Sequence, residues 1–133
     1  MKVDLDWVHH KLQEVVNHAY TPFSKFKVAC MLVANNQAFY GVNIENASYP
    51  VTLCAERSAI ANMVTSIGKA TIDYVFVYFD TKTPTNSPCG MCRQNIFEFA
   101  TDKTQLFCIE KDKSFKQFTI PEILKGGFRS YEQ

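Results

Sequence analysis

The chain has 133 residues, of which 47% are hydrophobic and 14% aromatic, and its formal net charge at pH 7 is +1. This composition predicts one globular domain over residues 1–133 with its own hydrophobic core. The near-neutral charge excludes the clustered basic surface by which proteins bind long nucleic acids or anionic membranes, so we expect a small substrate.

The pattern of apolar residues predicts alternating helices and strands. Leu5, Val8 and Leu12 recur at helical spacing, whereas Asn35-Asn36 between two β-rich stretches is typical of a hairpin turn. In chain order, the predicted elements are a helix at 4–19, strands at 26–34 and 37–42, a loop at 43–52, a helix at 53–66, a strand at 72–79, a loop at 80–88, a helix at 89–100, strands at 105–110 and 114–119, and a short helix at 121–124.

This order predicts the fold class. A hairpin followed by alternating helices and strands favours an α/β fold, here a three-layer α/β/α domain around a mixed five-stranded sheet. No apolar run approaches the roughly 20 residues that cross a bilayer, and the first residues lack the apolar core of a signal peptide. We therefore expect a cytoplasmic protein without membrane partners.

Two short motifs carry most of the chemical information. The first is Cys54-Ala55-Glu56-Arg57, and the second runs from Ser87 to Gln94 and contains Cys89 and Cys92. Both lie at predicted loop-to-helix junctions, where each cysteine would occupy a first helical turn. Three thiolates suit Zn²⁺, and three protein ligands leave a fourth position open for water, as in catalytic zinc sites. The sequence predicts a hydrolytic zinc site, with one Zn²⁺ per subunit.

Glu56, two residues after the first predicted ligand, has three interpretations. It is a surface glutamate, a fourth ligand that closes the site, or a proton carrier for a water on the metal. Its position beside Cys54 favours the third, which requires a carboxylate within reach of that water.

Arg57 follows Glu56 and is expected in the surroundings of the metal. Three thiolates with Zn²⁺ leave a net charge of −1, which would weaken the metal as a Lewis acid. A guanidinium that hydrogen-bonds the ligand sulfurs would withdraw part of that charge.

The other candidate ligands are set aside. Cys30 and Cys108 fall within predicted strands, where small buried thiols usually serve as apolar filling. The three histidines all lie on the first predicted helix, where exposed or capping roles are more common than metal binding; they are His9, His10 and His18.

Together with two further segments, these motifs resemble the homotetrameric cytidine deaminases of pyrimidine salvage over nearly the whole chain. The matching segments are Tyr20 to Phe26, Asn43 to Tyr49, Cys54 to Arg57, and Pro88 to Gln94. A ligand-x-Glu motif followed by Pro-Cys-x-x-Cys is the signature of zinc deaminases. The resemblance implies hydrolytic deamination of cytidine and 2′-deoxycytidine to uridine and 2′-deoxyuridine.

Residue roles follow from the same resemblance. Cys54, Cys89 and Cys92 would bind zinc, and Glu56 would pass protons to the base and to the departing ammonia. The predicted substrate contacts are Asn43 and Glu45 on the ribose hydroxyls, Phe26 near the base, the carbonyl of Ala55 on the exocyclic amine, and Phe128 in a neighbouring subunit's site. Without the resemblance, Asn43 is interpreted as a turn residue, Phe26 as a core residue and Phe128 as a docking residue of the last helix.

Two positions depart from the family pattern. Ala29 stands where the family usually has glycine, and Leu124-Lys125-Gly126-Gly127-Phe128 lacks the proline of the family's C-terminal motif. Three other functions remain open: a deaminase of blasticidin-type cytosine nucleosides, a nucleic-acid-editing deaminase, and a non-catalytic zinc-stabilised module. The asparagine and glutamate of the 43–49 segment, the low charge and Glu56, respectively, argue against them.

Overall fold

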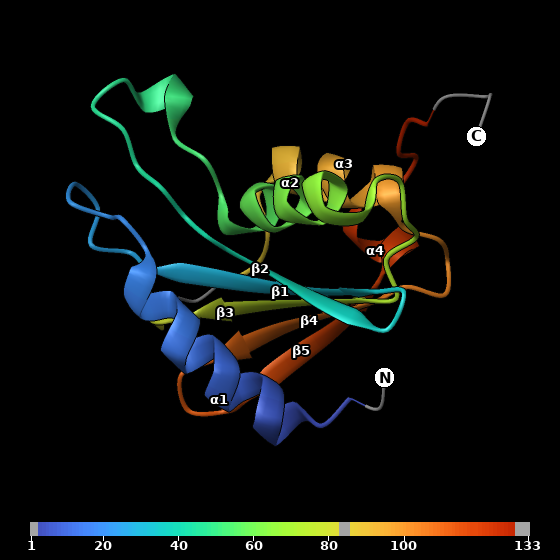
Figure 1. Cartoon of the computed structure of the whole chain (residues 1–133), viewed down its shortest axis with the longest axis horizontal. Helices are drawn as coiled ribbons and strands as arrows, with labels where there is room; N and C mark the ends of the chain where they lie inside the picture. The colour runs from blue at the N-terminus through green and yellow to red at the C-terminus, as the bar shows by residue number, and fades with distance from the viewer. Residues whose placement is uncertain (1–2, 83–85, 130–133) are drawn as a thin grey trace.

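A mixed five-stranded sheet forms the middle of the molecule in this computed structural model, which describes residues 3–82 and 86–129 (Figure 1). The strand order is β2-β1-β3-β4-β5. The neighbours β3 and β4 run parallel, whereas the other neighbouring pairs are antiparallel. The strands are β1 (Val28–Ala34), β2 (Gln37–Val42), β3 (Tyr74–Phe79), β4 (Gln105–Glu110) and β5 (Phe115–Thr119).

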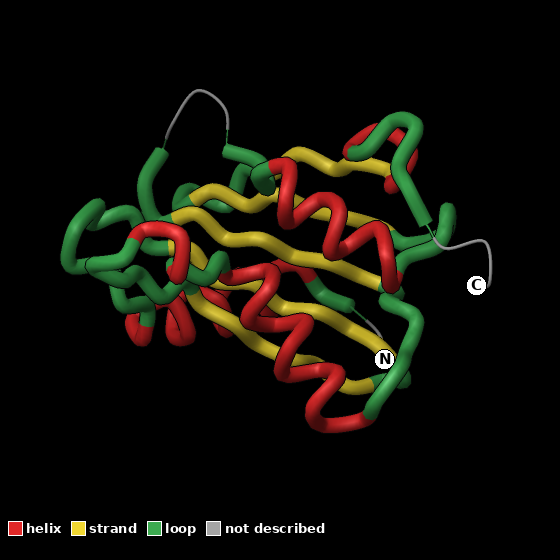
Figure 2. The backbone as a smooth tube through the Cα atoms, turned by 90° about the horizontal axis from the view of Figure 1, so that it is seen from above, coloured by secondary structure: helices red, strands yellow, loops and turns green. Residues whose placement is uncertain are grey.

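Helices cover both faces of this sheet, which confirms the predicted three-layer α/β/α arrangement. Helix α1 (Leu5–Val15) lies on one face, and α2 (Ala55–Ile67), α3 (Gly90–Phe99) and α4 (Ile120–Ile123) lie on the other (Figure 1). Figure 2 shows α2 and α3 side by side above the strands. Each face has its own cluster of buried apolar side chains.

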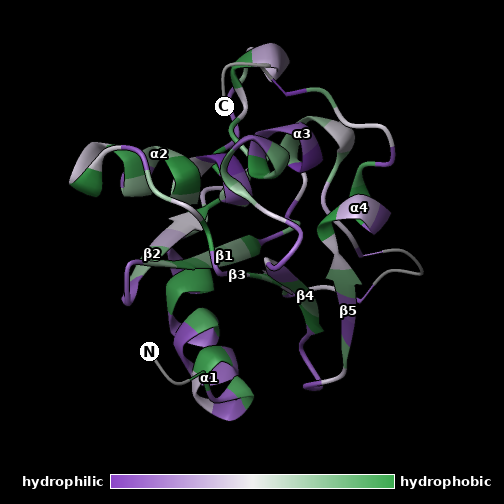
Figure 3. Ribbon diagram, turned by 90° about the vertical axis from the view of Figure 1, so that its right-hand side faces the viewer, coloured by the Kyte–Doolittle hydropathy of each residue, from purple (hydrophilic) through white to green (hydrophobic). Residues whose placement is uncertain are grey.

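Local sequence explains several of these elements. Asn35 and Asn36, with φ of 51° and 58°, make the predicted hairpin turn in the left-handed conformation that asparagine tolerates. Helix α1 begins after Asp4, whose side chain accepts a hydrogen bond from the backbone N–H of Asp6. Its apolar stripe, with Val8 and Leu12 buried, packs on the sheet while its polar side faces outward (Figure 3).

The ends of several elements differ from the sequence prediction. The α-helical part of 4–19 ends at Val15 and tightens into the 3₁₀ turn η1 (Val16–His18). A second 3₁₀ turn, η2 (Tyr49–Val51), lies within the predicted loop 43–52. Helix α4 begins at Ile120, one residue early, because Thr119 and Glu122 form a capping box.

Some predictions extend beyond the described residues. The predicted loop 80–88 includes residues 83–85, and the predicted single domain 1–133 includes both chain ends, all outside the described part. Within the described part, no helix is both long enough and apolar enough to cross a membrane.

Candidate metal centre and active site

Three cysteines from two helix starts converge at one end of the sheet. Cys54 is the N-cap residue of α2, and Cys89 is that of α3; Cys92 lies in the first turn of α3. Their Sγ atoms all lie within 4.8 Å of one another, and those of Cys54 and Cys89 are 4.0 Å apart. A tetrahedral Zn²⁺ with Zn–S bonds of about 2.3 Å places its sulfurs about 3.8 Å apart, so this cluster fits that ion with little movement.

The prediction that Cys54 and Cys89 occupy first helical turns differs from the structure by one residue. Both have extended backbones, with ψ of 155° and 167°, and neither side chain makes a capping hydrogen bond. Both sulfurs are therefore free of backbone N–H groups while they remain beside the positive ends of two helix dipoles. That position favours the thiolate form required of a metal ligand.

The three sulfurs also influence one another's ionisation. Hydrogen bonding from Cys92, followed by that from Cys89 and the charge of Arg57, lowers the pKa of Cys54 to about 5. The same contact with Cys54, together with burial, raises the pKa of Cys92. Negative charge in the cluster therefore falls first on Cys54, which is half-buried between exposed Cys89 and buried Cys92.

Glu56 is buried, with 4% of its surface exposed, which excludes the surface-glutamate interpretation. The metal-binding cluster among the described residues contains three cysteines and no carboxylate, which argues against Glu56 as a fourth ligand. Burial raises the pKa of Glu56 to about 7. Such a carboxyl group can hold a proton as well as release one.

Arg57 occupies the expected region, but its hydrogen bond goes to backbone. Its Nη2 donates to the carbonyl of Thr52 at 2.8 Å, which fixes the loop that leads into Cys54. Its Nε is buried without a hydrogen-bond partner among the described residues. A buried donor without a partner costs free energy, and the charge of Arg57 also lowers the pKa of Cys54.

A small cavity opens next to the cysteines and Glu56. Its volume is about 190 Å³, and Phe26, Asn43, Ala55, Glu56 and Cys89 are among the residues that line it. A larger surface cavity of about 670 Å³ lies at the other end of α3, beside Glu98, Asp102 and Arg129. The larger cavity lacks the cysteines, so the small one is the candidate active site.

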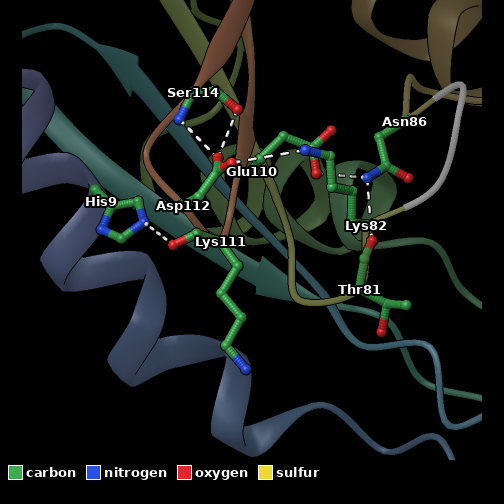
Figure 4. A network of polar contacts seen from close by, with 8 residues as sticks. All are labelled: His9, Thr81, Lys82, Asn86, Glu110, Lys111, Asp112 and Ser114. Atoms are coloured by element: carbon green, nitrogen blue, oxygen red, sulfur yellow. Dashed lines mark hydrogen bonds and ion pairs between the residues drawn. The ribbon is translucent and has the colours of Figure 1, made fainter.

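The loop before Cys89 is anchored to the neighbouring strand through Asn86 (Figure 4). Asn86 is buried, and its Nδ2 donates to Glu110 Oε2 at 2.8 Å and to the carbonyl of Thr81 at 3.1 Å. Glu110 is the last residue of β4, so this contact ties the loop to the sheet.

The sequence model of one protein family, the cytidine and deoxycytidylate deaminase zinc-binding region, matches residues 2–108 of this chain. The chain belongs to this family. A cytidine deaminase of Mycoplasma genitalium is 67% identical over 129 residues, which cover 97% of this chain and 98% of that one. One from Halalkalibacterium halodurans is 38% identical over 111 residues, 83% of each chain.

A solved structure of this deaminase family shows the same fold. The cytidine deaminase of Burkholderia pseudomallei superposes with a TM-score of 0.84 at 28% identity, covering 95% of this chain and 100% of that one. The predicted α/β fold and the predicted family are thus both confirmed.

Of the predicted substrate contacts, Asn43 and Glu45 both hold local backbone. Asn43 Nδ2 donates to the carbonyl of Phe26 at 2.7 Å, and its Oδ1 accepts from the N–H of Val28 at 3.0 Å. Glu45 Oε1 accepts from the N–H groups of Phe23 and Ser24 at 2.9 and 3.0 Å. Hydrogen bonding, chiefly with the side chain of Ser24, lowers the pKa of Glu45, so this carboxylate is ionised.

Phe26 and Ala55 lie at the candidate site, whereas Phe128 does not. Phe26 lines the small cavity and packs against Phe79, with ring centroids 6.2 Å apart. Phe128 is 78% exposed and borders a different cavity, beside Arg57, Met91 and Gln94. One chain therefore brings Cys54, Cys89, Glu56, Phe26, Asn43 and Ala55 to one cavity, with Cys92 in the same cysteine cluster. Glu45 borders a second cavity, with Phe23 and Tyr49, and Phe128 lies outside both.

The residues set aside during sequence analysis stay outside the metal cluster. Cys30 and Cys108 are buried in β1 and β4, as predicted. His9 differs from the expected exposure: it is 4% exposed, packs edge-on against Tyr78, and its Nε2 lies 3.2 Å from the carbonyl of Lys111 (Figure 4). It follows Val8 on the buried side of α1, where its ring extends the apolar stripe.

Proposed function

We propose that this chain catalyses the zinc-dependent hydrolysis of cytidine and 2′-deoxycytidine to uridine and 2′-deoxyuridine, with release of ammonia. The observation that carries the proposal is the pairing of an open three-cysteine cluster with a buried, non-ligating carboxylate beside one small cavity. The names of the relatives in the family support the substrate.

Cys54, Cys89 and Cys92 would hold one Zn²⁺ per chain, with Arg57 balancing part of their charge. When bound, zinc would lower the pKa of a water molecule in the open fourth position so that the water can attack C4 of the pyrimidine. Glu56 would accept the proton of that water, pass it to N3, and later deliver a proton to the departing amine. The reaction consumes one water and releases one ammonia.

Other residues would hold the substrate in place. Asn43, oriented by its two backbone contacts, and the carboxylate of Glu45 would face the ribose hydroxyls. Phe26 would pack near the base, and the Ala55 carbonyl would accept from the exocyclic amine. The exposure of Phe128 supports a role in the site of a neighbouring subunit, within a cytoplasmic homotetramer.

A nucleoside assay tests this proposal directly. Purified, zinc-loaded protein should release one ammonia for each cytidine or 2′-deoxycytidine converted, and light scattering should give the mass of four chains. Zinc-loaded protein that leaves both nucleosides intact but deaminates a blasticidin-type nucleoside would refute the substrate. A monomeric mass with full activity would refute the shared site.

The metal ligands are tested with two matched buried cysteines. Cys92 and Cys108 are both buried in the described structure, but Cys92 alone of this pair belongs to the cluster. Cys92→Ala should retain well below one zinc per chain after dialysis, as should Cys54→Ala and Cys89→Ala, whereas Cys108→Ala should retain one. Mass spectrometry of bound metal gives the readout, and full zinc in Cys92→Ala would contradict the assignment.

A further inference from the structure

Arg93 belongs to the second cysteine motif but has no role in the proposed reaction. It lies one helical turn after Cys89, and its guanidinium makes three side-chain hydrogen bonds. Nε donates to the carbonyl of Pro88 at 2.8 Å, Nη2 to Ser87 Oγ at 3.0 Å, and Nη1 to the carbonyl of Ile123 at 2.9 Å. All three nitrogens of the guanidinium therefore donate a hydrogen bond.

Two of these bonds fix the residues directly before a metal ligand. The Pro88 carbonyl belongs to the peptide plane that contains the nitrogen of Cys89, so holding this oxygen fixes the orientation of that plane. Cys89 makes no capping hydrogen bond of its own and is exposed, so its own side chain adds no such restraint. Arg93 restrains this junction from within α3 by donating to the carbonyl before Cys89, whereas a serine or aspartate cap would accept from the first N–H groups of the helix.

The third bond connects this loop to the end of α4, thirty residues further along the chain. Ile123 is the last residue of α4, where helical carbonyls lack partners within the helix. Gln94, the residue after Arg93, makes a second contact with the C-terminal segment: its Nε2 donates to the carbonyl of Phe128 at 2.9 Å. Adjacent residues of α3 thus hold both the metal-ligand loop and the C-terminal segment.

We propose that Arg93 is a positioning residue that fixes Cys89 for metal binding and at the same time secures α4 to α3. The inference rests on the proposed metal site, and it goes beyond that proposal by assigning the geometry of one ligand to a residue that does not touch the metal. Residues that orient metal ligands typically change metal affinity by about 10- to 100-fold when they are replaced.

The test compares two lysine substitutions, one in α3 and one in the C-terminal segment that bonds the end of α3. Arg93→Lys keeps the charge but loses the planar fork, because an ammonium group cannot address three separate acceptors in one plane. Arg129→Lys is the matched control: Arg129 bonds the carbonyls of Phe97 and Ala100 at 2.9 Å each and stacks on Phe97 at 3.7 Å, at the opposite end of α3 from Cys89. Both changes should lower the unfolding temperature.

Metal affinity separates positioning from a purely structural role. With Co²⁺ as the probe and a chelator as competitor, Arg93→Lys should bind about 10- to 100-fold more weakly, with altered thiolate-to-cobalt absorption, while Arg129→Lys should match the wild type. Ser87→Ala removes one of the three hydrogen bonds, so we expect a smaller loss of Co²⁺ affinity. If Arg93→Lys does not fold, the Co²⁺ affinity of Ser87→Ala tests the inference.

Wild-type cobalt affinity in Ser87→Ala and in folded Arg93→Lys would overturn the inference. An equal loss of affinity in Arg129→Lys would also overturn it, because stability alone would then explain the effect. A wild-type protein that binds Co²⁺ without thiolate absorption would instead refute the metal site, and with it the proposed function.

Discussion

Glu56→Gln should reduce the turnover of cytidine by about 10²- to 10⁴-fold while the protein still binds one zinc per chain. The amide has the same shape as the carboxylate but cannot accept the proton of the attacking water, and proton transfer by a positioned group typically contributes this much to the rate. Glu56 is buried beside the cluster without belonging to it, so its replacement leaves the three sulfurs in place.

The measurement is kcat for ammonia release, together with the zinc content of each preparation. Glu14→Gln serves as the control, because Glu14 is an exposed residue of α1 on the other face of the sheet and pairs with His10. It should keep full activity. A Glu56→Gln enzyme that retains more than about a tenth of the wild-type rate would exclude Glu56 as the main proton carrier.

Gly41→Ala should lower the free energy of unfolding by about 3 kcal/mol or more, since overpacking against rigid atoms has a large cost. Gly41 lies in β2 under α2, and a Cβ atom there would overlap backbone atoms of Ala55 and Ala59 and lie 2.8 Å from the carbonyl carbon of Ser58. Backbone cannot rotate away as a side chain can, so α2 would have to move.

This movement has a second consequence, because α2 begins directly after Cys54 and carries Glu56 in its first turn. We therefore expect Gly41→Ala to bind zinc more weakly as well. Urea unfolding and metal content provide the two readouts. The control is Gly90→Ala, where an added Cβ meets no atom within 4 Å and the free energy of unfolding should change by less than about 1 kcal/mol. An unchanged midpoint for Gly41→Ala would show that α2 does not pack this closely on β2.

Helices and strands could be predicted because their signals are local. The alternation of apolar residues and the Asn35-Asn36 pair depend on neighbours a few positions away, so the order of elements was correct. The predicted helices 53–66 and 89–100 begin one or two residues earlier than α2 and α3, because the N-cap residues Cys54 and Cys89 are not of the types that usually mark a helix start. The turn η2 was missed inside a polar loop, although Pro50 favours the first turn of a helix.

The part of the candidate site that could be predicted is the part that depends on residue type alone. Three thiolates and one carboxylate indicate an open zinc site wherever they meet, and the structure brings Cys54, Cys89 and Cys92 within reach of one ion. The burial of Glu56, by contrast, depends on the packing of α2 against the sheet. His9 shows the same limit, because its neighbours in sequence do not reveal that β3 and the 110–114 turn cover it.

The sequence by itself determined the order of elements, the chemistry of the two cysteine motifs and the family resemblance, because each depends on residue type and short spacing. Only the tertiary structure decided the strand order, the close approach of α2 to Gly41, the position of Phe128 outside the cavity and the contacts of Arg93. These features depend on contacts between residues far apart in the sequence, from 14 positions for Gly41 and Ala55 to 51 for Val28 and Phe79, and such contacts form only when the chain folds back on itself.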